Sequence, residues 1–466
     1  MDKADHNGDN ISYQFCREVG KALEANYHKR SSHRKAESIW SSTSVLPGFQ
    51  QLKGDRKTDV LIIGGGMAGI LCAYMLDQAG VDYMLVEAEK IGSGITKDTI
   101  AKITIQHGLI FQKLMKYYGA EKAELYLRAN QEALRKFTEM CSEIDCDYEE
   151  KDSFVYSLDN PTAIHDELDA LGKLNFSAEF VRQLPLPFSV AGAIRFAHQA
   201  QFHPLKFIQA IAGELNIYEH TMVRKLKGHC AVTDQGTITA DKIIVATHFP
   251  FMNRHGSYFL KMYQHRSYVL ALEHAPEVNG MYVDEAETGM SFRNYQGMLL
   301  IGGGDHRTGK QGGNWTELRR FASQHYPEAK ECWHWSTQDC MTLDGIPYIG
   351  RYSRFTPDIY VATGFNKWGM TSSMVSAMLL TDLVTGRENP YAAVFSPSRS
   401  MLRVQLAINA VEATRNLLTL STPRCPHLGC ALKWNEAEQS WDCPCHGSRF
   451  DEKGKLINNP AMRDKR

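Results

Sequence analysis

The order of apolar and polar residues predicts alternating strands and helices over most of the chain. Val60–Ile63 is a short all-apolar run, as a strand buried on both faces of a parallel sheet requires, and a glycine-rich turn and an apolar helical segment follow it. Tyr83–Glu87 has the length and composition of a second strand. Apolar residues at helical spacing predict two helices in Phe111–Cys146, another in Leu158–Leu171 and another in Leu205–Leu215. This alternation is typical of an α/β fold.

The rest of the chain adds a second kind of pattern. A strand pair is expected near Met222–Ala246, and residues 260–340 alternate apolar and polar positions with many aromatics, which predicts the strands of a mixed sheet. A helix-rich segment, Ser398–Leu418, leads into a short cysteine-rich end. Residues 1–55 are polar and form an N-terminal extension with one amphipathic helix, Ile11–Arg30, to which we assign no chemistry.

Composition limits the classes of function. The chain has 466 residues, enough for two or three domains, and a formal net charge of −1, which gives no electrostatic case for binding nucleic acid or an anionic membrane. No apolar signal segment follows the start, and the longest apolar run, Val60–Leu76, is interrupted by four glycines, so we expect no integral membrane segment. Seven of the eleven cysteines are scattered, the usage of reduced thiols in a cytoplasmic protein.

The turn after the first strand carries a nucleotide-binding pattern. Gly64, Gly66 and Gly69 fill GxGxxG between a strand and a helix, where they permit a tight turn, close approach of a pyrophosphate and close helix–strand packing. Glu87 ends the next strand, 23 positions after Gly64, where a carboxylate accepts hydrogen bonds from a ribose. A glycine-rich turn without a ligand is the alternative. The acid favours FAD or NAD over NADP.

Two further segments favour FAD. The Gly/Ser/Thr-rich stretch from Gly92 to Gly108 includes Thr99, and the stretch around Gly364 continues as Phe-Asn-Lys-Trp-Gly-Met, with Trp368, Gly369 and Met370. Both resemble flavin-binding segments of the D-amino-acid oxidase superfamily. The resemblance implies that a helix starting near Gly369 directs its N-terminus at the flavin, where its partial positive charge stabilises the reduced ring. An ordinary strand–helix unit is the alternative for this second segment.

Four residues are candidates for catalysis. The same resemblance places Arg293 where related oxidases hold substrate groups over the flavin, and a guanidinium suits a carboxylate; a surface or interdomain ion pair is the alternative. Lys102 is a candidate for polarising the flavin N5 region, or for a plain salt bridge. His107 and His306 are candidate bases, although hydrogen-bonded core histidines are the more common case.

The C-terminal end carries a second redox motif. Cys425-x-His427 and Cys443-x-x-His446 lie in two loops, CPHLGC and CPCHGS, whose first cysteines are 18 positions apart. Two thiolates and two imidazoles are the ligands of a Rieske 2Fe–2S centre, in which one iron takes both sulfurs and the other both histidines. Zinc accepts the same four ligands, but a zinc site has no use for the paired loops.

The two loops resemble the cluster-binding part of Rieske proteins. The resemblance implies a Cys430–Cys445 disulfide between the loops, against the reduced character of the other cysteines. It also exposes two departures: the base of strands that precedes the first loop in complete Rieske domains is missing, and Phe450 stands where high-potential members have a tyrosine. The hydroxyl of Ser448, which bonds a bridging sulfide in those proteins, is kept. Losing one donor lowers the expected reduction potential.

The whole chain is therefore similar to flavin oxidoreductases of the D-amino-acid oxidase superfamily with a C-terminal Rieske domain, a group resembling the YhfW-type proteins of Bacillus. The expected architecture is a Rossmann-type FAD-binding domain interleaved with an α+β substrate domain, plus a small all-β Rieske module. We expect the following boundaries: an N-terminal extension at 1–55, the oxidoreductase at 56–397 with nucleotide-binding parts at about 56–150, 200–255 and 340–390 and a substrate domain at about 150–200 and 260–340, a helical linker at 398–420, and a truncated Rieske module at 421–466.

The implied function is oxidation of a small substrate, an amine or amino acid, by hydride transfer to FAD. The electrons then pass to the 2Fe–2S cluster and to an external acceptor, a redox protein or a quinone. Two alternatives remain: a plain oxidase that uses oxygen and keeps a structural Rieske module, and a redox-sensing flavoprotein that binds a partner.

Overall fold

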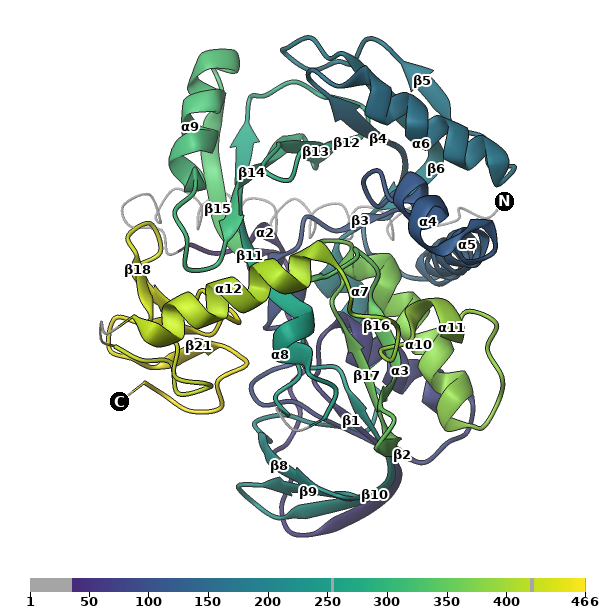
Figure 1. The fold of residues 1–466 in the computed structure, drawn as a ribbon, viewed down its shortest axis with the longest axis vertical. Helices are drawn as coiled ribbons and strands as arrows, with labels where there is room; N and C mark the ends of the chain where they lie inside the picture. Colours follow the sequence, from purple (N-terminus) through teal and green to yellow (C-terminus); the bar gives the residue numbers. More distant parts are fainter. Residues whose placement is uncertain (1–35, 253–254, 420–422, 466) are drawn as a thin grey trace, which may run out of the picture. The chain divides into compact units, whose positions relative to one another are not determined.

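The computed structural model describes residues 36–252, 255–419 and 423–465. The chain divides into two units, residues 1–37 and 38–466. The amphipathic helix expected at Ile11–Arg30 lies outside the described residues. Within the second unit, two large sheets and one small sheet are formed (Figure 1).

The first large sheet is the nucleotide-binding sheet. Its central strands β17, β10, β1, β2 and β7 run parallel in this order, with β16 antiparallel at one edge and the β8–β9 hairpin attached to β10. The apolar run Val60–Ile63 is fully buried, as expected for a strand covered on both faces. The strands are β1 (Arg56–Ile63), β2 (Tyr83–Val86), β7 (Ile217–Tyr218), β8 (Val223–Lys227), β9 (Cys230–Thr233), β10 (Thr237–Val245), β16 (Tyr348–Ser353) and β17 (Thr356–Thr363).

The second large sheet is mostly antiparallel and interleaves with the first along the chain. Its order is β15-β11-β14-β13-β12-β4-β6-β3, with β5 beside β6, and β11 pairs with both β14 and β15 along most of its length. The strands are β3 (Lys102–Ile103), β4 (Glu149–Ser157), β5 (Glu179–Val181), β6 (Gly192–Gln201), β11 (Met262–Glu273), β12 (Met281–Asp284), β13 (Ser291–Tyr295), β14 (Met298–Arg307) and β15 (Lys330–Thr342).

Helices cover both sheets. α3 and α10 are apolar on nearly every face and pack against each other over the nucleotide-binding sheet, which is why they are buried almost completely. The two helices expected in Phe111–Cys146 are α4 and α5. The helices are α2 (Ile39–Ser42), α3 (Met67–Gln78), η1 (Ile95–Asp98, a 3₁₀ turn), α4 (Phe111–Tyr118), α5 (Ala120–Ser142), α6 (Pro161–Lys173), α7 (Pro204–Ala212), α8 (Tyr258–Lys261), α9 (Asn314–His325), α10 (Gly369–Val384), α11 (Ala392–Phe395) and α12 (Val404–Leu418).

The C-terminal residues form a small module. Four strands of three residues each build a meander, β18 (Lys433–Asn435), β19 (Ser440–Asp442), β20 (Arg449–Asp451) and β21 (Leu456–Asn458). Its interior contains the four cysteines of the loops and only a few other apolar side chains, among them Leu432, Phe450 and Ala461. Such a core is too small to stabilise a free-standing domain.

The α/β fold with interleaved sheets and a small all-β C-terminal module is confirmed. No helix in the described ranges is long and apolar enough to cross a membrane. The N-terminal extension, for which the sequence predicted only the helix Ile11–Arg30, also contains α2 in its described part. Trp40 on this helix is completely buried and donates a hydrogen bond to the carbonyl oxygen of Thr99 (2.6 Å). A single tryptophan therefore anchors a polar segment whose periodicity gave no helical signal.

Candidate functional site

The GxGxxG turn follows β1 and has the geometry of a nucleotide-binding turn. Gly64 has a φ of +112°, and a Cβ there would lie 2.5 Å from the carbonyl oxygen of Ala246. A Cβ on Gly69 would overlap the carbonyl oxygen of Gly64, so close packing of helix and strand excludes a side chain. Gly66 precedes α3 and offers no capping side chain. The amide of Met67 donates to the hydroxyl of Thr96, and the amides that follow it in the first turn remain open to an anion.

Glu87 lies at the end of β2 beside this turn. Its carboxylate accepts hydrogen bonds from the amides of Gly65 (2.7 Å) and Glu89 (2.9 Å), and burial raises its pKa. The open amides, the acid and the absence of a side chain at Gly66 fit the dinucleotide part of FAD.

The two expected flavin segments pack against this region. Thr96 accepts a hydrogen bond from the amide of Met67 (3.0 Å), which brings the 92–108 stretch onto the start of α3. Thr99 bonds within its own loop, to the amide of Ala101 (3.0 Å). Gly364 has a φ of +72° in a turn where a Cβ would overlap the side chain of Thr342.

The start of α10 lies next to His107. Trp368 is the residue before the helix, and no side chain caps the first turn, so amides near Gly369 and Met370 point out of the helix start. The ring of His107 stacks on that of Trp368, with the ring centroids 5.1 Å apart. His107 also bonds Tyr126 (2.7 Å) and Thr371 (2.9 Å), and burial lowers its pKa to about 3.

Lys102 and Arg293 lie close to each other at the 92–108 stretch. Lys102 donates to the carbonyl oxygen of Tyr282 (3.1 Å), and burial, with the charge of Arg293, lowers its pKa to about 7. Arg293 is 0% exposed and donates to the carbonyl oxygens of Ile100 (2.7 Å) and Ala101 (2.8 Å). Burial lowers the pKa of Arg293 to about 9.

The guanidinium of Arg293 is enclosed by protein. It stands 5.4 Å from the ring of Trp40 and 5.8 Å from that of Tyr295. Its Nε and Nη2 are buried without a hydrogen-bond partner among the residues that the structure describes. Through its bonds to Ile100 and Ala101, the side chain of Arg293 thus holds in place the backbone that leads into Lys102.

His306 lies elsewhere, on the face of β14 that contacts the C-terminal module. Its Nε2 is 2.9 Å from the hydroxyl of Tyr268, which in turn donates to Glu438 (3.0 Å). Burial lowers the pKa of His306. The structure therefore brings Lys102, His107 and Arg293 to the flavin segments and places His306 at the domain contact.

The two cluster loops have matching backbone geometry. The amide of Cys425 donates to the carbonyl oxygen of Cys430, and the amide of Cys443 donates to that of Ser448, both at 2.9 Å. Gly429 and Gly447, with φ of +81° and +80°, donate back to the first cysteine of their own loops, at 2.9 and 2.8 Å. The two loops thus share one backbone turn with the cysteine at the same place, while His427 is two positions and His446 three positions after its cysteine.

The four expected ligands converge. The thiols of Cys425 and Cys443 are hydrogen-bonded to each other, which lowers the pKa of Cys425 to about 7. The rings of His427 and His446 stand perpendicular with centroids 5.0 Å apart. The Nδ1 of His446 is buried and has no hydrogen-bond partner in the described ranges. A thiol pair beside an imidazole pair fits the donor set of a Rieske 2Fe–2S centre.

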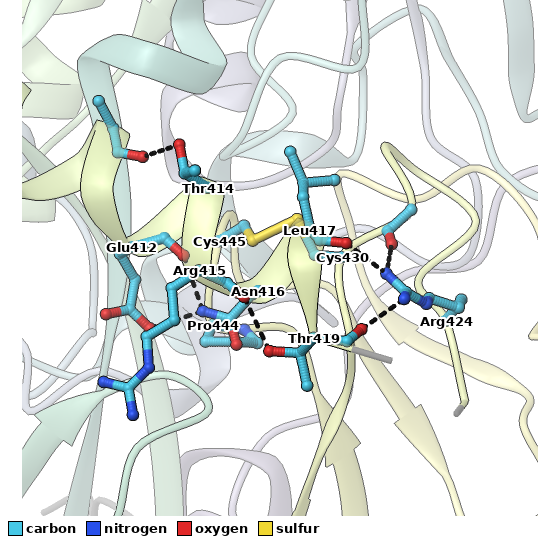
Figure 2. Close-up of a disulfide and its surroundings, with 12 residues drawn as sticks. Glu412, Thr414, Arg415, Asn416, Leu417, Thr419, Arg424, Cys430, Pro444 and Cys445 are labelled. Carbon is cyan, nitrogen blue, oxygen red and sulfur yellow. Dashed lines mark hydrogen bonds between the residues drawn. A yellow bond between two sulfur atoms is a disulfide. The ribbon is translucent and has the colours of Figure 1, made fainter. Parts of the chain in front are cut away.

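A disulfide joins Cys430 and Cys445 across the loops, with Cα atoms 6.6 Å apart. The sulfur of Cys443 lies within 4.8 Å of both bonded sulfurs. Figure 2 shows this disulfide beside α12, whose end is tied to the first loop because Arg424 donates to the carbonyl oxygens of Leu417 (3.0 Å) and Thr419.

The residues around the loops match the expected departures. Phe450 is completely buried and supplies no hydroxyl. The hydroxyl of Ser448 lies near the thiol of Cys425, whose pKa it helps to lower, and accepts a hydrogen bond from the amide of Ala461 (3.0 Å).

The module is fixed to the substrate sheet by residues that sequence reasoning missed. Gln264 on β11 donates to the carbonyl oxygen of His446 (2.7 Å), and Gln338 on β15 donates to that of Gly447 (2.9 Å). A Cβ on Gly447 would lie 2.7 Å from Gln264, so only glycine permits this approach. The ring of Phe259, 6.1 Å from that of His446, closes the contact.

An ionic network completes the contact. Glu438 of the module forms an ion pair with Arg266 of β11 and another with Arg449 (2.8 Å), which lies on strand β20 of the module. Arg449 also forms an ion pair with Asp442 (2.9 Å). The side chains of Arg266, Glu438 and Arg449 are 2%, 7% and 6% exposed. Because these charges satisfy one another, they can be buried between module and sheet.

Comparisons with known proteins agree with both sites. The family described as FAD dependent oxidoreductase matches residues 59–383, and the Rieske [2Fe-2S] domain matches residues 397–465. The chain is 34% identical over 490 aligned positions to the Bacillus subtilis protein YhfW, whose name describes it as a Rieske 2Fe-2S iron-sulfur protein, covering 92% of this chain and 96% of that one.

Two further comparisons address the parts separately. The iron-sulfur subunit of the cytochrome b6-f complex of Nostoc punctiforme is 57% identical over 37 residues, 8% of this chain and 21% of that one. The structure of glycine oxidase from Geobacillus kaustophilus superimposes with a TM-score of 0.63 at 20% identity, covering 74% of this chain and 99% of that one. The latter is a likeness of fold.

Proposed function

Because the chain belongs to the family of FAD-dependent oxidoreductases and continues into a Rieske [2Fe–2S] domain, we propose that it oxidises a small amine or amino acid and delivers the electrons through the cluster to an external acceptor. When bound, FAD accepts a hydride and the cluster carries single electrons. The acceptor that this proposal favours is a redox protein or a quinone.

The proposal assigns each cofactor to its own set of residues. Open amides after Gly66 would bind the pyrophosphate, Glu87 would bind a ribose, and amides at the start of α10 would face the flavin ring. The thiolates of Cys425 and Cys443 and the imidazoles of His427 and His446 would hold the cluster.

The docking of the module carries the proposal. The carbonyl group of the expected ligand His446 is hydrogen-bonded to Gln264, on a strand of the sheet whose other face looks towards the flavin segments. That orientation follows from Trp335 on the adjacent strand β15, which donates to the carbonyl oxygen of Asp98 in η1 (2.9 Å). A module held there stays attached to the oxidoreductase, which supports direct transfer of electrons to the cluster.

His446→Ala tests this path. The change removes one ligand of the histidine-bound iron but leaves the flavin segments intact, so an amine or amino acid that bleaches the flavin should still do so anaerobically. Reduction of an added quinone or redox protein should fail, while slow reoxidation by oxygen persists. Lys433→Ala, a change at an exposed position of the module outside both loops, serves as the control. If the His446 variant reduces the acceptor as fast as the parent, the cluster is not on the path and a plain oxidase is the better description.

A further inference from the structure

A group of charged side chains lies beside the start of α10 and belongs to neither set of expected ligands. Lys367, two residues before Gly369, forms an ion pair with Asp305 at the end of β14. Burial lowers the pKa of Lys367, but the charges of Asp305, Asp339 and Glu287 outweigh it and raise the pKa. Lys367 lies just before α10, Asp305 is on β14 and Asp339 is on β15. The three residues lie near the segment that would face the flavin ring.

The strand register defines which face of the sheet carries the group. Asp339 on β15 is the direct partner of His265 on β11, so both side chains point to the same face. Gln264 and Gln338, one residue away on each strand, point to the opposite face and hold the cluster module. Asp339 and His265 therefore belong to the face that looks towards the flavin segments.

This group contains side-chain atoms that could accept a hydrogen bond and have no donor among the described residues. The side chain of Asp305 is 8% exposed, and its Oδ1 is buried without a hydrogen-bond partner among the described residues. The carboxylate of Asp339 accepts no hydrogen bond in the described part of the chain. The Nδ1 of His265 is buried and lacks a partner there too. Two carboxylates thus face a single lysine that already pairs with one of them.

The nearby guanidinium groups are committed elsewhere. Arg266, whose charge acts on Asp339, forms an ion pair with Glu438. Arg307 donates through Nε to the carbonyl oxygen of Pro444 (3.3 Å) and through Nη1 to Asn409 (3.0 Å), which leaves Nη2 as its one unpartnered nitrogen among the described residues. The Oδ1 of Asp305 therefore still lacks a donor among the described residues, and a buried carboxylate oxygen without a partner is unfavourable unless a donor or cation joins it.

We infer that Asp305 and Asp339 form a subsite for the ammonium group of the substrate. This inference rests on the proposed function and narrows it: the substrate is a cationic amine, and a carboxylate on that amine is not required for recognition. The carboxylates supply the negative charge that pairs with the ammonium group of the substrate, and the ion pair with Lys367 holds Asp305 in place.

The electrostatics of Asp339 agree with this role. Burial raises its pKa to about 6, Lys367 and Arg266 oppose the rise, and Asp305 adds to it. Burial lowers the pKa of the facing His265 to about 3, so that ring contributes no charge near neutral pH. The subsite should therefore bind a cation well at pH 7.5 and lose affinity as Asp339 takes up a proton below about pH 6.

The decisive experiment measures binding without turnover. tert-Butylamine carries an ammonium group but no hydrogen on the carbon next to nitrogen, so it cannot be oxidised by hydride transfer. Its dissociation constant with the FAD-loaded protein is measured by isothermal titration calorimetry at pH 7.5 and pH 5. Asp305→Asn and Asp339→Asn should each weaken binding at least tenfold at pH 7.5. Asp241→Asn, an exposed acid on β10, should bind like the parent.

Several outcomes decide between the claims. Unchanged affinity in both variants, with normal FAD content, overturns the subsite. Anaerobic flavin bleaching by simple amines, reduced in both variants, supports it. Bleaching by amino acids alone, unaffected by either substitution, overturns the subsite but leaves the proposed function standing. If tert-butylamine binds through both aspartates and yet no amine or amino acid bleaches the flavin, the subsite holds and the proposed oxidation fails.

Discussion

The nucleotide turn and the cluster module hold their groups by different means. At the turn, the contacts are backbone amides made accessible by glycine, and the surrounding sheet and helices α3 and α10 form a large apolar core. In the module, the ligands are side chains, and the body around them has little apolar content. A disulfide, an ionic network and two glutamines from another sheet supply what that small core lacks.

Because of this difference, different kinds of substitution are expected to disrupt the two sites. A site made of backbone in a large core fails when a side chain intrudes, and it tolerates changes in the identity of the surrounding residues. A site made of side chains on a small body fails when a ligand or a support is removed.

The largest effect is expected at a ligand of the module. Cys443→Ser removes one of the two sulfurs and should abolish the cluster, because a serine hydroxyl does not replace a thiolate on iron. Iron and labile sulfide analysis should give none, while FAD content stays near one per chain. Cys230→Ser, at a half-buried cysteine on β9, should keep the full cluster. A loaded Cys443 variant would show that another residue supplies that ligand.

An equally complete loss, here of FAD, is expected when a side chain is introduced at the nucleotide turn. Gly66→Val places a side chain at the start of α3, in the space that the pyrophosphate needs, and should expel FAD. The absorbance ratio of flavin to protein measures this directly, and the cluster should remain. The same change at Gly172, where a Cβ would meet nothing within 4 Å, is the control. Full flavin in the Gly66 variant would mean that the binding turn lies elsewhere.

Removing a support of the module should have an intermediate effect. Glu438→Gln leaves Arg266 and Arg449 buried without their shared partner, which costs about 3–5 kcal/mol. We expect an earlier, separate loss of the cluster in thermal unfolding, while the flavin is released at the parent temperature. Glu436→Gln, on the exposed side of the same turn, should melt like the parent. A single transition shared by flavin and cluster in both proteins would contradict the idea that the network supports the module alone.

The same network predicts how the module responds to pH. Burial alone would raise the pKa of Glu438, but Arg266 and Arg449 hold it well below its usual range. A carboxylate with a depressed folded-state pKa stabilises fully above its unfolded pKa of about 4.3 and loses that contribution as the pH falls below it. Cluster retention should therefore decline below about pH 4 in the parent. In Glu438→Gln this acid-dependent decline should be weaker.

The smallest effect concerns the disulfide. Replacing Cys430 and Cys445 together by serine removes no ligand but frees the two loops, at a cost of about 2–4 kcal/mol. The cluster should form and then be lost sooner on heating or on storage with a chelator. Cys332→Ser/Cys340→Ser, two buried cysteines of β15, gives a double variant for comparison. Parental cluster lifetime in the loop variant would show that the bridge has no stabilising role.

The contrast also explains what the sequence could predict. The glycine turn, the flavin segments and the two cluster loops are local patterns, in which each residue constrains its near neighbours, so their elements and most of their residues could be foreseen. The Cys430–Cys445 pairing followed from resemblance to proteins with the same loops. The roles of Lys102, His107, Arg293 and His306 remain predictions.

The supports could not be foreseen because they join distant parts of the chain. Gln264 and His446 are 182 positions apart, and neither has a local pattern that marks the pair. Trp40 lies in a polar stretch, and only tertiary packing makes it a core residue. Asp305 and Lys367 lie within glycine-rich stretches that drew attention for other reasons, and their pairing became visible only when β14 and the start of α10 met.

The hydrogen bonds from Gln264 and Gln338 to the second cluster loop have a kinetic consequence. A redox module tethered by a free linker visits donor and acceptor in turn, and its turnover is limited by its own diffusion. Here the loop of His446 is fastened to the donor, so the acceptor must travel instead, to the half-buried side where His427 and the exposed Leu428 lie. Turnover should then rise linearly with acceptor concentration and fall with solvent viscosity, as in a bimolecular encounter.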